Sequence, residues 1–189
     1  FDCHEADVVT LYLLQSTNQK LKEQLSQQLK PGAKIVSHTF SMEGWAPIAI
    51  DDDKGICDVI SELVETFYSW GNVIAFTNAD EAIDYCLQRE VGVAIFIIDV
   101  FLGGLSGFYF LDAIEKKYPT AHQDAIIISG NASDDVVNMC LASRVNYLLE
   151  KPIKPYALQL AVRAITGKYL DFAKKLLQDT SYANSVAKL

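Results

Sequence analysis

Four apolar runs, each followed at once by charged or polar residues, constrain this chain more than any other feature. The runs cover residues 47–50, 94–98, 125–128 and 147–150, and they lead into Asp51-Asp52-Asp53, Asp99, Ser129 and Lys151-Pro152. Continuous runs rich in β-branched residues are typical of strands that are buried on both faces of a parallel sheet. In such sheets ligands bind beyond the carboxyl ends of the strands. We therefore expect these acids, the hydroxyl and the amine to meet at one edge of the sheet.

The segments between the runs carry apolar residues at helical spacing. These segments lie within residues 56–67, 82–87, 110–114, 136–141 and 158–165, and residues 73–76 supply one further strand. Strands that alternate with helices predict βαβ units with right-handed crossovers. The sequence therefore predicts an α/β fold, a doubly wound five-stranded parallel sheet.

The predicted cluster of acids indicates a metal site. Carboxylates crowded at one edge repel one another unless a divalent cation lies among them, and oxygen ligands without nearby His or Cys favour Mg²⁺. An aspartate beside a cation, a lysine and a hydroxyl is suited to accept a phosphoryl group as a nucleophile. The cation and the lysine would neutralise the charge on the phosphoryl oxygens.

The stretch from residue 46 to residue 165 resembles the receiver domains of two-component response regulators. The motifs that carry the resemblance agree in order and spacing, and they are Ile50-Asp51-Asp52-Asp53, residues 99–107 (DVFLGGLSG), Ile128-Ser129-Gly130 and Glu150-Lys151-Pro152-Ile153. The resemblance implies a flavodoxin-like fold with strand order 2-1-3-4-5. It also implies a phosphoprotein that acts in a two-component phosphorelay through an aspartyl phosphate.

The resemblance assigns roles residue by residue. Asp99 would be the phosphoacceptor, and the peptide bond before Pro152 would be cis. The Mg²⁺ ligands would be Asp51, Asp52, Asp99 and the backbone carbonyl of Phe101, and the phosphate-binding residues would be Ser129, Gly130 and Lys151. Asp52 with Asp53 stays open as the alternative acidic pair.

Two positions depart from the family pattern. Gly103 stands where the family usually has proline, so we expect a looser loop after the acceptor. The family's aromatic switch residue is expected three positions before Lys151, where this chain has Leu148, with Tyr147 one place earlier. Ser129, Leu148 and Tyr147 are therefore the candidate switch residues, and we expect the readout to differ from that of the family.

Composition excludes several classes of protein. No apolar stretch approaches the roughly 18 residues that span a bilayer, so we expect no membrane segment. The net charge of −8 is concentrated in residues 47–166, which hold 17 acids and 8 bases, and no Lys/Arg cluster is present. We therefore expect no nucleic-acid partner. The scattered cysteines, including Cys57, Cys86 and Cys140, predict buried thiols in a reducing cytoplasm.

The first 46 residues form a separate pattern. Residues 7–14 read as a strand, 16–29 as a helix and 33–38 as a second strand, which is one βαβ unit. The segment resembles class I S-adenosylmethionine-dependent methyltransferases over residues 6–14, Asn18 and residues 29–38, but it covers only the fourth and fifth strands of that fold. Because the family's Gly-rich cofactor loop is absent, we expect no methyltransferase activity from these 189 residues. The chain opens with Phe1 rather than Met, so we expect a longer gene.

The carboxyl-terminal residues predict an additional helix. Residues 168–189 have amphipathic spacing with a break near Thr180-Ser181. We read this helix as docked on the receiver or as a linker, and a dimerisation or signalling helix is the alternative. The expected division is therefore 1–46, 47–166 and 167–189.

The leading interpretation is a cytoplasmic phosphorylation switch. A histidine kinase or a histidine phosphotransfer protein would donate to Asp99, and the output partner is unknown. We expect no enzyme beyond self-catalysed phosphoryl transfer and slow dephosphorylation, and a homodimer stays open. The alternatives are a receiver that regulates a truncated methyltransferase and a passive pseudo-receiver. An aspartate-nucleophile phosphatase is disfavoured, because Phe101 stands where such enzymes have a second Asp.

Overall fold

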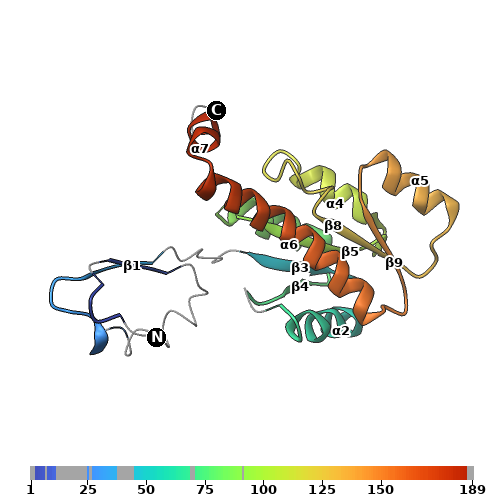
Figure 1. Ribbon diagram of the computed structural model, residues 1–189. Coiled ribbons are helices and arrows are strands. Elements are labelled where there is room, and N and C mark those ends of the chain that lie inside the picture. Colours follow the sequence, from blue (N-terminus) through green and yellow to red (C-terminus); the bar gives the residue numbers. More distant parts are fainter. Residues whose placement is uncertain are drawn as a thin grey trace. The chain divides into compact units, whose positions relative to one another are not determined.

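The structure is a computed structural model that describes residues 3–6, 8–11, 25, 27–37, 45–68, 71–90 and 92–186. The chain divides into two compact units, Phe1–Glu43 and Gly44–Leu189 (Figure 1). The division falls three residues before the boundary expected at residue 46. Trp45 belongs to the second unit, where its backbone carbonyl accepts a hydrogen bond from the Tyr68 hydroxyl at 3.0 Å.

The second unit is built on a five-stranded parallel sheet. Its strands are β3 (Ala46–Ile50), β4 (Ile74–Phe76), β5 (Ala94–Asp99), β8 (Ala125–Ser129) and β9 (Tyr147–Glu150). They lie in the order β4-β3-β5-β8-β9, which is 2-1-3-4-5 when the strands of this unit are counted along the chain. The predicted doubly wound α/β fold is confirmed.

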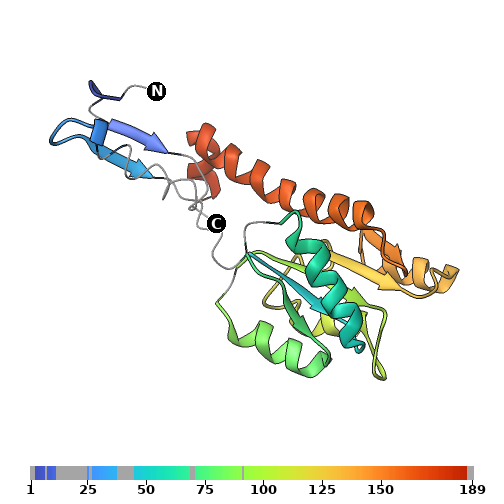
Figure 2. The same cartoon turned by 90° about the horizontal axis from the view of Figure 1, so that it is seen from below.

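Helices cover both faces of this sheet (Figure 2). The helices α2 (Lys54–Glu65) and α6 (Pro155–Gln178) pack on one face, and α3 (Ala79–Gln88), α4 (Gly107–Ile114) and α5 (Asp134–Ala142) pack on the other. Successive residues of a strand alternate between two cores, so Ile97 packs with α2 and α6 while Ile98 packs with the other three helices. Burial of each of these isoleucines stabilises the fold by about 1.5–3 kcal/mol. Because both faces of the strands are covered, their sequences are continuous apolar runs.

The segment after Asp99 contains Gly103, the position where we expected a looser loop than in the family. Its residues form a hairpin of β6 (Phe101–Leu102) and β7 (Leu105–Ser106), which pair antiparallel. Gly103 and Gly104 form the two-residue turn with φ of +58° and +106°. A turn with positive φ at both positions suits a two-residue hairpin and excludes proline, whose φ is fixed near −65°. Gly103 therefore allows a hairpin turn that proline at this position would prevent.

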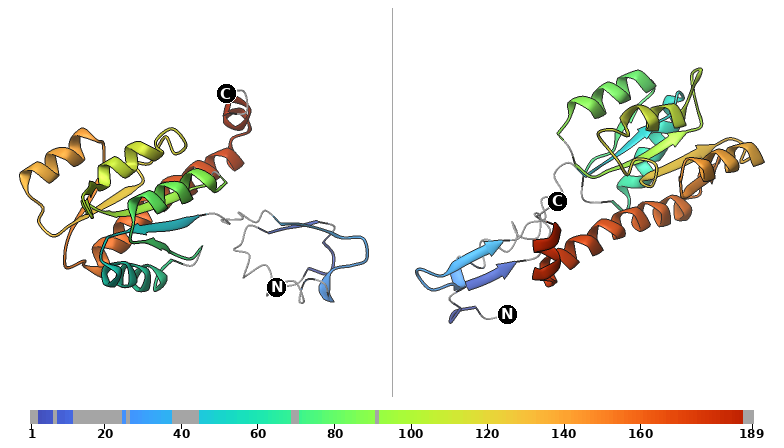
Figure 3. Two further views of the ribbon diagram at one scale, coloured as in Figure 1. Left: turned by 180° about the vertical axis from the view of Figure 1, so that it is seen from behind. Right: turned by 90° about the horizontal axis from the view of Figure 1, so that it is seen from above.

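The boundary expected between residues 166 and 167 falls inside one continuous helix. The helix α6 continues for 24 residues, from Pro155 through Gly167 to Gln178 (Figure 3). The predicted break lies at Asp179, after which α7 (Thr180–Val186) begins. The rings of Phe172 in α6 and Tyr182 in α7 meet edge to face with centroids 6.2 Å apart, a separation typical of aromatic pairs.

The described part of the first unit contains two parallel paired strands. These are β1 (Val8–Leu11) and β2 (Lys34–Ser37), which lie within the two strands predicted there. Most of the helix predicted over residues 16–29 and Asn18 lie outside the described residues. Within the described ranges of the whole chain, no helix is both long enough and apolar enough to cross a membrane.

Candidate functional site

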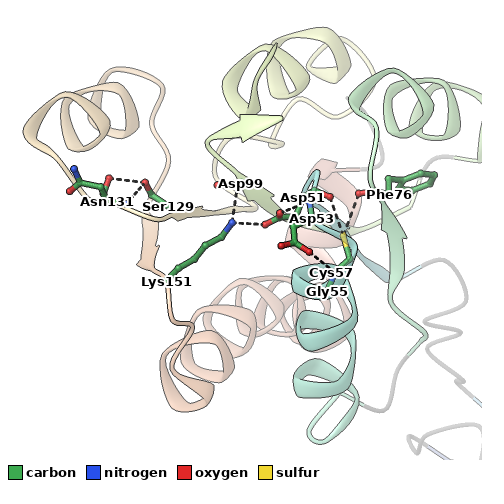
Figure 4. A network of polar contacts seen from close by, with 9 residues as sticks. All are labelled: Asp51, Asp53, Gly55, Cys57, Phe76, Asp99, Ser129, Asn131 and Lys151. Atoms are coloured by element: carbon green, nitrogen blue, oxygen red, sulfur yellow. Dashed lines mark hydrogen bonds and ion pairs between the residues drawn. The ribbon is translucent and has the colours of Figure 1, made fainter. Parts of the chain in front are cut away.

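Side chains at the carboxyl ends of β3, β5 and β9 meet at one edge of the sheet (Figure 4). Lys151, just after β9, reaches across this edge and lies between two acids. Its Nζ is 2.8 Å from Oδ2 of Asp51 and 3.0 Å from Oδ2 of Asp99. The two acids come from the adjacent strands β3 and β5, so one lysine bridges the two central strands. The Lys151–Pro152 peptide bond is cis, as the resemblance implied.

Asp51 is the most deeply buried acid of the edge, with none of the residue exposed. Its Oδ1 accepts a hydrogen bond from the backbone N–H of Asp53 at 3.0 Å. Burial raises the pKa of Asp51, and it outweighs the lowering by Lys151 and by the Asp53 N–H. Burial alone would lower the pKa of Lys151, but its contacts with Asp51 and Asp99 raise the pKa above the usual value.

Asp51, Asp52 and Asp99 form a group that could hold a cation. Each offers one carboxylate oxygen, and these oxygens all lie within 4.8 Å of one another. Asp52 is exposed, whereas Asp51 and Asp99 are buried, so the group opens to solvent on one side. Asp53 has a different role, the N-cap of α2. Its Oδ1 accepts a hydrogen bond from the backbone N–H of Gly55 at 2.7 Å.

Ser129 ends β8 at the same edge, but its hydroxyl is engaged within its own loop. The Oγ donates to the backbone carbonyl of Asn131 at 2.7 Å and accepts the Asn131 N–H at 3.2 Å (Figure 4). The backbone carbonyl of Ser129 accepts the N–H of Lys151 at 2.8 Å, which ties the two strand ends together. At Gly130, an added Cβ would meet no atom within 4 Å, so open space adjoins the Ser129 loop.

At Gly107 the chain comes back close to the backbone of Asp99, at the end of β5. A Cβ on Gly107 would lie 2.3 Å from the backbone oxygen of Asp99, so only glycine fits there. The Gly107 N–H donates to the carbonyl of Val100 at 2.9 Å. The hairpin that precedes Gly107 leaves the Phe101 residue 68% exposed. This close approach restricts the backbone around Asp99. It was not identified from the sequence, although Gly107 is the last residue of the motif 99–107.

The two candidate switch residues on β9 lie on opposite faces of the sheet. Leu148 packs against the core beneath α3, α4 and α5, whereas Tyr147 packs against the core beneath α2 and α6. Ser129, two residues after Ile127, lies on the same face as Leu148. Of the two residues, only Leu148 therefore shares a face of the sheet with Ser129, and the switch role of each stays a prediction.

Cys57 is a contact of the site that sequence reasoning had treated only as a buried thiol. Its Sγ lies 3.4 Å from the backbone carbonyl of Asp51 and 3.5 Å from that of Phe76 (Figure 4). The thiol therefore joins the start of α2 to the ends of β3 and β4. Burial raises its pKa, so it stays a neutral donor. The buried, unpaired state predicted for Cys57, Cys86 and Cys140 is confirmed.

Two family models match the chain. One, described as a response regulator receiver domain, matches residues 48–163. The other, described as an ANTKMT methyltransferase domain, matches residues 1–49. The two matches meet at β3, the first strand of the second unit.

Two curated proteins also match parts of the chain. The transcriptional regulatory protein YvrH of Bacillus subtilis (strain 168) is 28% identical over 123 residues, which are 65% of this chain and 49% of that protein. A protein-lysine N-methyltransferase of Saccharolobus islandicus (strain REY15A) is 50% identical over 46 residues, which are 24% of this chain and 29% of that protein. The chain thus spans less than half the length of each of these relatives.

Solved structures support the fold of the second unit. A response regulator receiver domain protein from Clostridium thermocellum aligns with a TM-score of 0.59 at 23% identity, covering 71% of this chain and 99% of that one. The receiver domain of the Francisella response regulator 1452 aligns with a TM-score of 0.57 at 21% identity, covering 67% of this chain and 99% of that one.

Proposed function

Because the receiver model matches more than half of its residues, the chain belongs to the response regulator receiver family, and we propose that it is a switch phosphorylated on Asp99 in a Mg²⁺-dependent reaction. The observation that carries the proposal is the ion pairing of Lys151 with Asp51 and Asp99 beside an acidic trio. These contacts bring the Asp99 carboxylate, the Lys151 ammonium and three carboxylates to one edge of the sheet, which supports Asp99 as the nucleophile that we propose.

The residues fit a Mg²⁺ ion. The three carboxylates of Asp51, Asp52 and Asp99 are hard oxygen ligands that lie close together, and the backbone carbonyl of Phe101 is the fourth protein ligand that we propose. A bound Mg²⁺ would neutralise charge on the phosphoryl oxygens during transfer. The exposed Asp52 and the buried, destabilised carboxylate of Asp51 would both gain a cationic partner.

The chain's own residues perform the remaining steps. One carboxylate oxygen of Asp99 attacks phosphorus while the bond from phosphorus to the donor's leaving atom breaks, and the electron pair of that bond stays with the leaving group. Lys151 then exchanges its contact with the Asp99 carboxylate for a phosphoryl oxygen. The Ser129 hydroxyl rotates away from the Asn131 carbonyl to donate to another phosphoryl oxygen. The open space beside Gly130 leaves room for the group.

Receiver domains work with histidine kinases and output domains. We propose that the phosphoryl donor is a histidine kinase or a histidine phosphotransfer protein, since both present a phosphohistidine whose P–N bond is labile. The acidic charge of residues 47–166 gives no basis for a nucleic-acid partner. We also propose that the chain has no separate substrate and that its chemistry is confined to its own Asp99.

Treatment with a small phosphodonor tests this function without a cognate kinase. Acetyl phosphate with Mg²⁺ is expected to produce a phosphoprotein, and excess EDTA is expected to prevent it. An acyl phosphate is cleaved by hydroxylamine, whereas phosphate esters of Ser or Tyr survive. No label, a label formed equally in EDTA, or a hydroxylamine-resistant label would contradict the proposal.

A second candidate function follows from the first unit. Residues 1–49 match a methyltransferase model, and 46 residues are 50% identical to part of a protein-lysine N-methyltransferase. We propose that the receiver regulates a methyltransferase domain to which this segment belongs. The matched segment covers 29% of that relative and contains no Gly-rich cofactor loop, so the remaining strands would have to come from elsewhere.

The reading frame upstream of Phe1 tests this second function. A Gly-rich loop after a predicted strand in that frame would support it. The protein extended by that frame should then transfer a methyl group from S-adenosylmethionine to a lysine-containing protein, at a rate that depends on phosphorylation. A frame without such a motif, or a rate that is indifferent to phosphorylation, would contradict it.

A further inference from the structure

A second polar cluster lies at the amino ends of the central strands, opposite the phosphorylation site. Asp124 directly precedes β8, and only 2% of the residue is exposed. Its carboxylate pairs with the ammonium of Lys168 and accepts the hydroxyl of Tyr169, and its Oδ2 accepts the Thr120 hydroxyl at 2.7 Å. A buried carboxylate with this many partners is held in one position.

The backbone of Asp124 also belongs to the sheet. Its carbonyl accepts the N–H of Phe96, in β5, at 3.0 Å. The strand β5 carries Asp99 at its other end, and β8 carries Ser129. The cluster therefore contacts β5 and β8 near their amino ends. The carboxyl ends of the same two strands carry Asp99 and Ser129.

Tyr169 extends this cluster to the start of the second unit. Its hydroxyl contacts Thr120 at 3.0 Å, and its ring meets the ring of Trp45 edge to face, with centroids 5.8 Å apart. The backbone of Trp45 is fixed as well, because its carbonyl accepts the Tyr68 hydroxyl and a Cβ on Gly71 would lie 2.6 Å from it. Trp45 directly precedes β3, so the chain from the first unit enters the sheet at this contact.

The helix α6 connects the two edges of the sheet. It begins at Pro155, four positions after Lys151, and it contains Lys168 and Tyr169. The 14 residue-to-residue steps from Pro155 to Tyr169 span about 21 Å at the rise of an α-helix. Because α6 is one continuous helix, a displacement of its first turn would be carried along the helix towards the cluster.

We propose that Trp45, Thr120, Asp124, Lys168 and Tyr169 form a joint through which occupancy of the phosphorylation site is sensed where the chain enters from the first unit. The inference rests on the proposed function, since it needs Lys151 to change partners when a phosphoryl group binds. Lys151 would move the start of α6, and the joint would pass this movement to Trp45. The joint thus gives the receiver an output at the amino edge of its sheet.

Trp45 itself provides the measurement. The full chain has two tryptophans, Trp45 and Trp70, so the variant Trp70→Phe leaves Trp45 as the only one. Beryllofluoride with Mg²⁺ serves as the probe because it mimics a phosphoryl group on aspartate, and fluorine NMR reports its binding independently. We expect beryllofluoride to shift the Trp45 emission maximum. In Asp124→Asn and Tyr169→Leu the shift is expected to be lost while bound fluoride is still detected.

A matched control uses another ion pair on the same helix. Asp171→Asn removes the exposed partner of Lys174, 3.5 Å away in α6, and should keep the shift. Bound beryllofluoride without a shift of the Trp45 emission maximum would overturn the joint. A shift that survives Asp124→Asn would also overturn it. Absence of bound fluoride would contradict the proposed function and this inference with it. If a variant unfolds, 5-fluorotryptophan incorporated into Trp70→Phe reports on Trp45 alone, and a Trp45 resonance that does not respond to bound beryllofluoride would overturn the joint.

Discussion

At the scale of single residues, the site balances burial against ion pairing. Asp51 is fully buried beside Asp99, and Lys151 is the described cation that lies within ion-pair distance of both. Burial nevertheless dominates at Asp51 and raises its pKa. The charged form of Asp51 is therefore costly in the metal-free site, and a bound cation would offset that cost.

The first prediction concerns Asp51→Asn in the absence of metal. Because the pKa of Asp51 is raised by burial in the folded protein, its charged form costs stability near neutral pH, and Asn removes that cost. Urea unfolding in EDTA should show the variant to be more stable near neutral pH. The difference should shrink as the pH falls through the folded pKa towards 3.8, since Asp51 is then protonated in both states. A less stable variant near neutral pH would mean that the Lys151 ion pair outweighs burial.

The second prediction separates the two exposed acids, Asp52 and Asp53. Asp52→Ala removes a proposed metal ligand and should weaken Mg²⁺ binding while the metal-free protein keeps or gains stability. Asp53→Ala removes the cap of α2 and should cost about 1 kcal/mol with little effect on Mg²⁺ affinity. Magnesium titrations and thermal melts measure both. The reverse assignment of effects would favour Asp52 with Asp53 as the metal pair.

At the scale of elements, two glycines at the site serve opposite purposes. Gly107 brings its loop against the backbone of Asp99, where no side chain fits, whereas Gly130 faces open space. The first glycine is required by the fold itself. A small residue in place of Gly130 should leave the structure unchanged. Such a replacement should affect only the binding of a group in the open space beside it.

The third prediction compares alanine at these two positions. Gly107→Ala should destabilise the protein by about 1–3 kcal/mol, because its Cβ overlaps the Asp99 carbonyl. Gly130→Ala should change stability by less than about 0.5 kcal/mol but slow labelling by acetyl phosphate. Chemical unfolding and labelling rates measure the two effects. Equal stability losses would show that the space beside Gly130 is not open.

Much of the fold followed from sequence pattern, and the exceptions have physical causes. The strands and the site edge were predictable, since buried parallel strands leave continuous apolar runs. The hairpin around Gly103 was not, because its two-residue strands are too short to show alternation. The continuity of α6 was hidden by Gly167, a residue that costs a helix about 1 kcal/mol relative to alanine. Thr166 is nevertheless buried and Tyr169 is tied to Asp124, so tertiary contacts hold the helix there.

The partner of Ser129 could not be read from the sequence either. Its bond with Asn131 depends on the conformation of a loop rather than on a periodic pattern. The faces of Leu148 and Tyr147, by contrast, were readable, since neighbouring residues of a strand point to opposite sides.

At the scale of the whole molecule, the second unit contains every proposed site residue and both cores. The fourth prediction is that residues 44–189 fold alone and are labelled by acetyl phosphate at nearly the rate of the full chain. Residues 47–189 lack Trp45, which accepts the Tyr68 hydroxyl and contacts Tyr169, and should be less stable. Circular dichroism and labelling measure both. Failure of residues 44–189 to fold would show that the first unit belongs to the receiver core.

The central claim is that Asp99 accepts the phosphoryl group, and site-mapped labelling tests it most directly. The full chain is treated with acetyl phosphate and Mg²⁺, and borohydride reduction followed by peptide mass spectrometry locates the modified aspartate. The account predicts modification at Asp99, no label in Asp99→Asn, and full label in Asp84→Asn, which changes an exposed acid of α3. A label that persists in Asp99→Asn, or that maps to another aspartate in the unmodified chain, would contradict it.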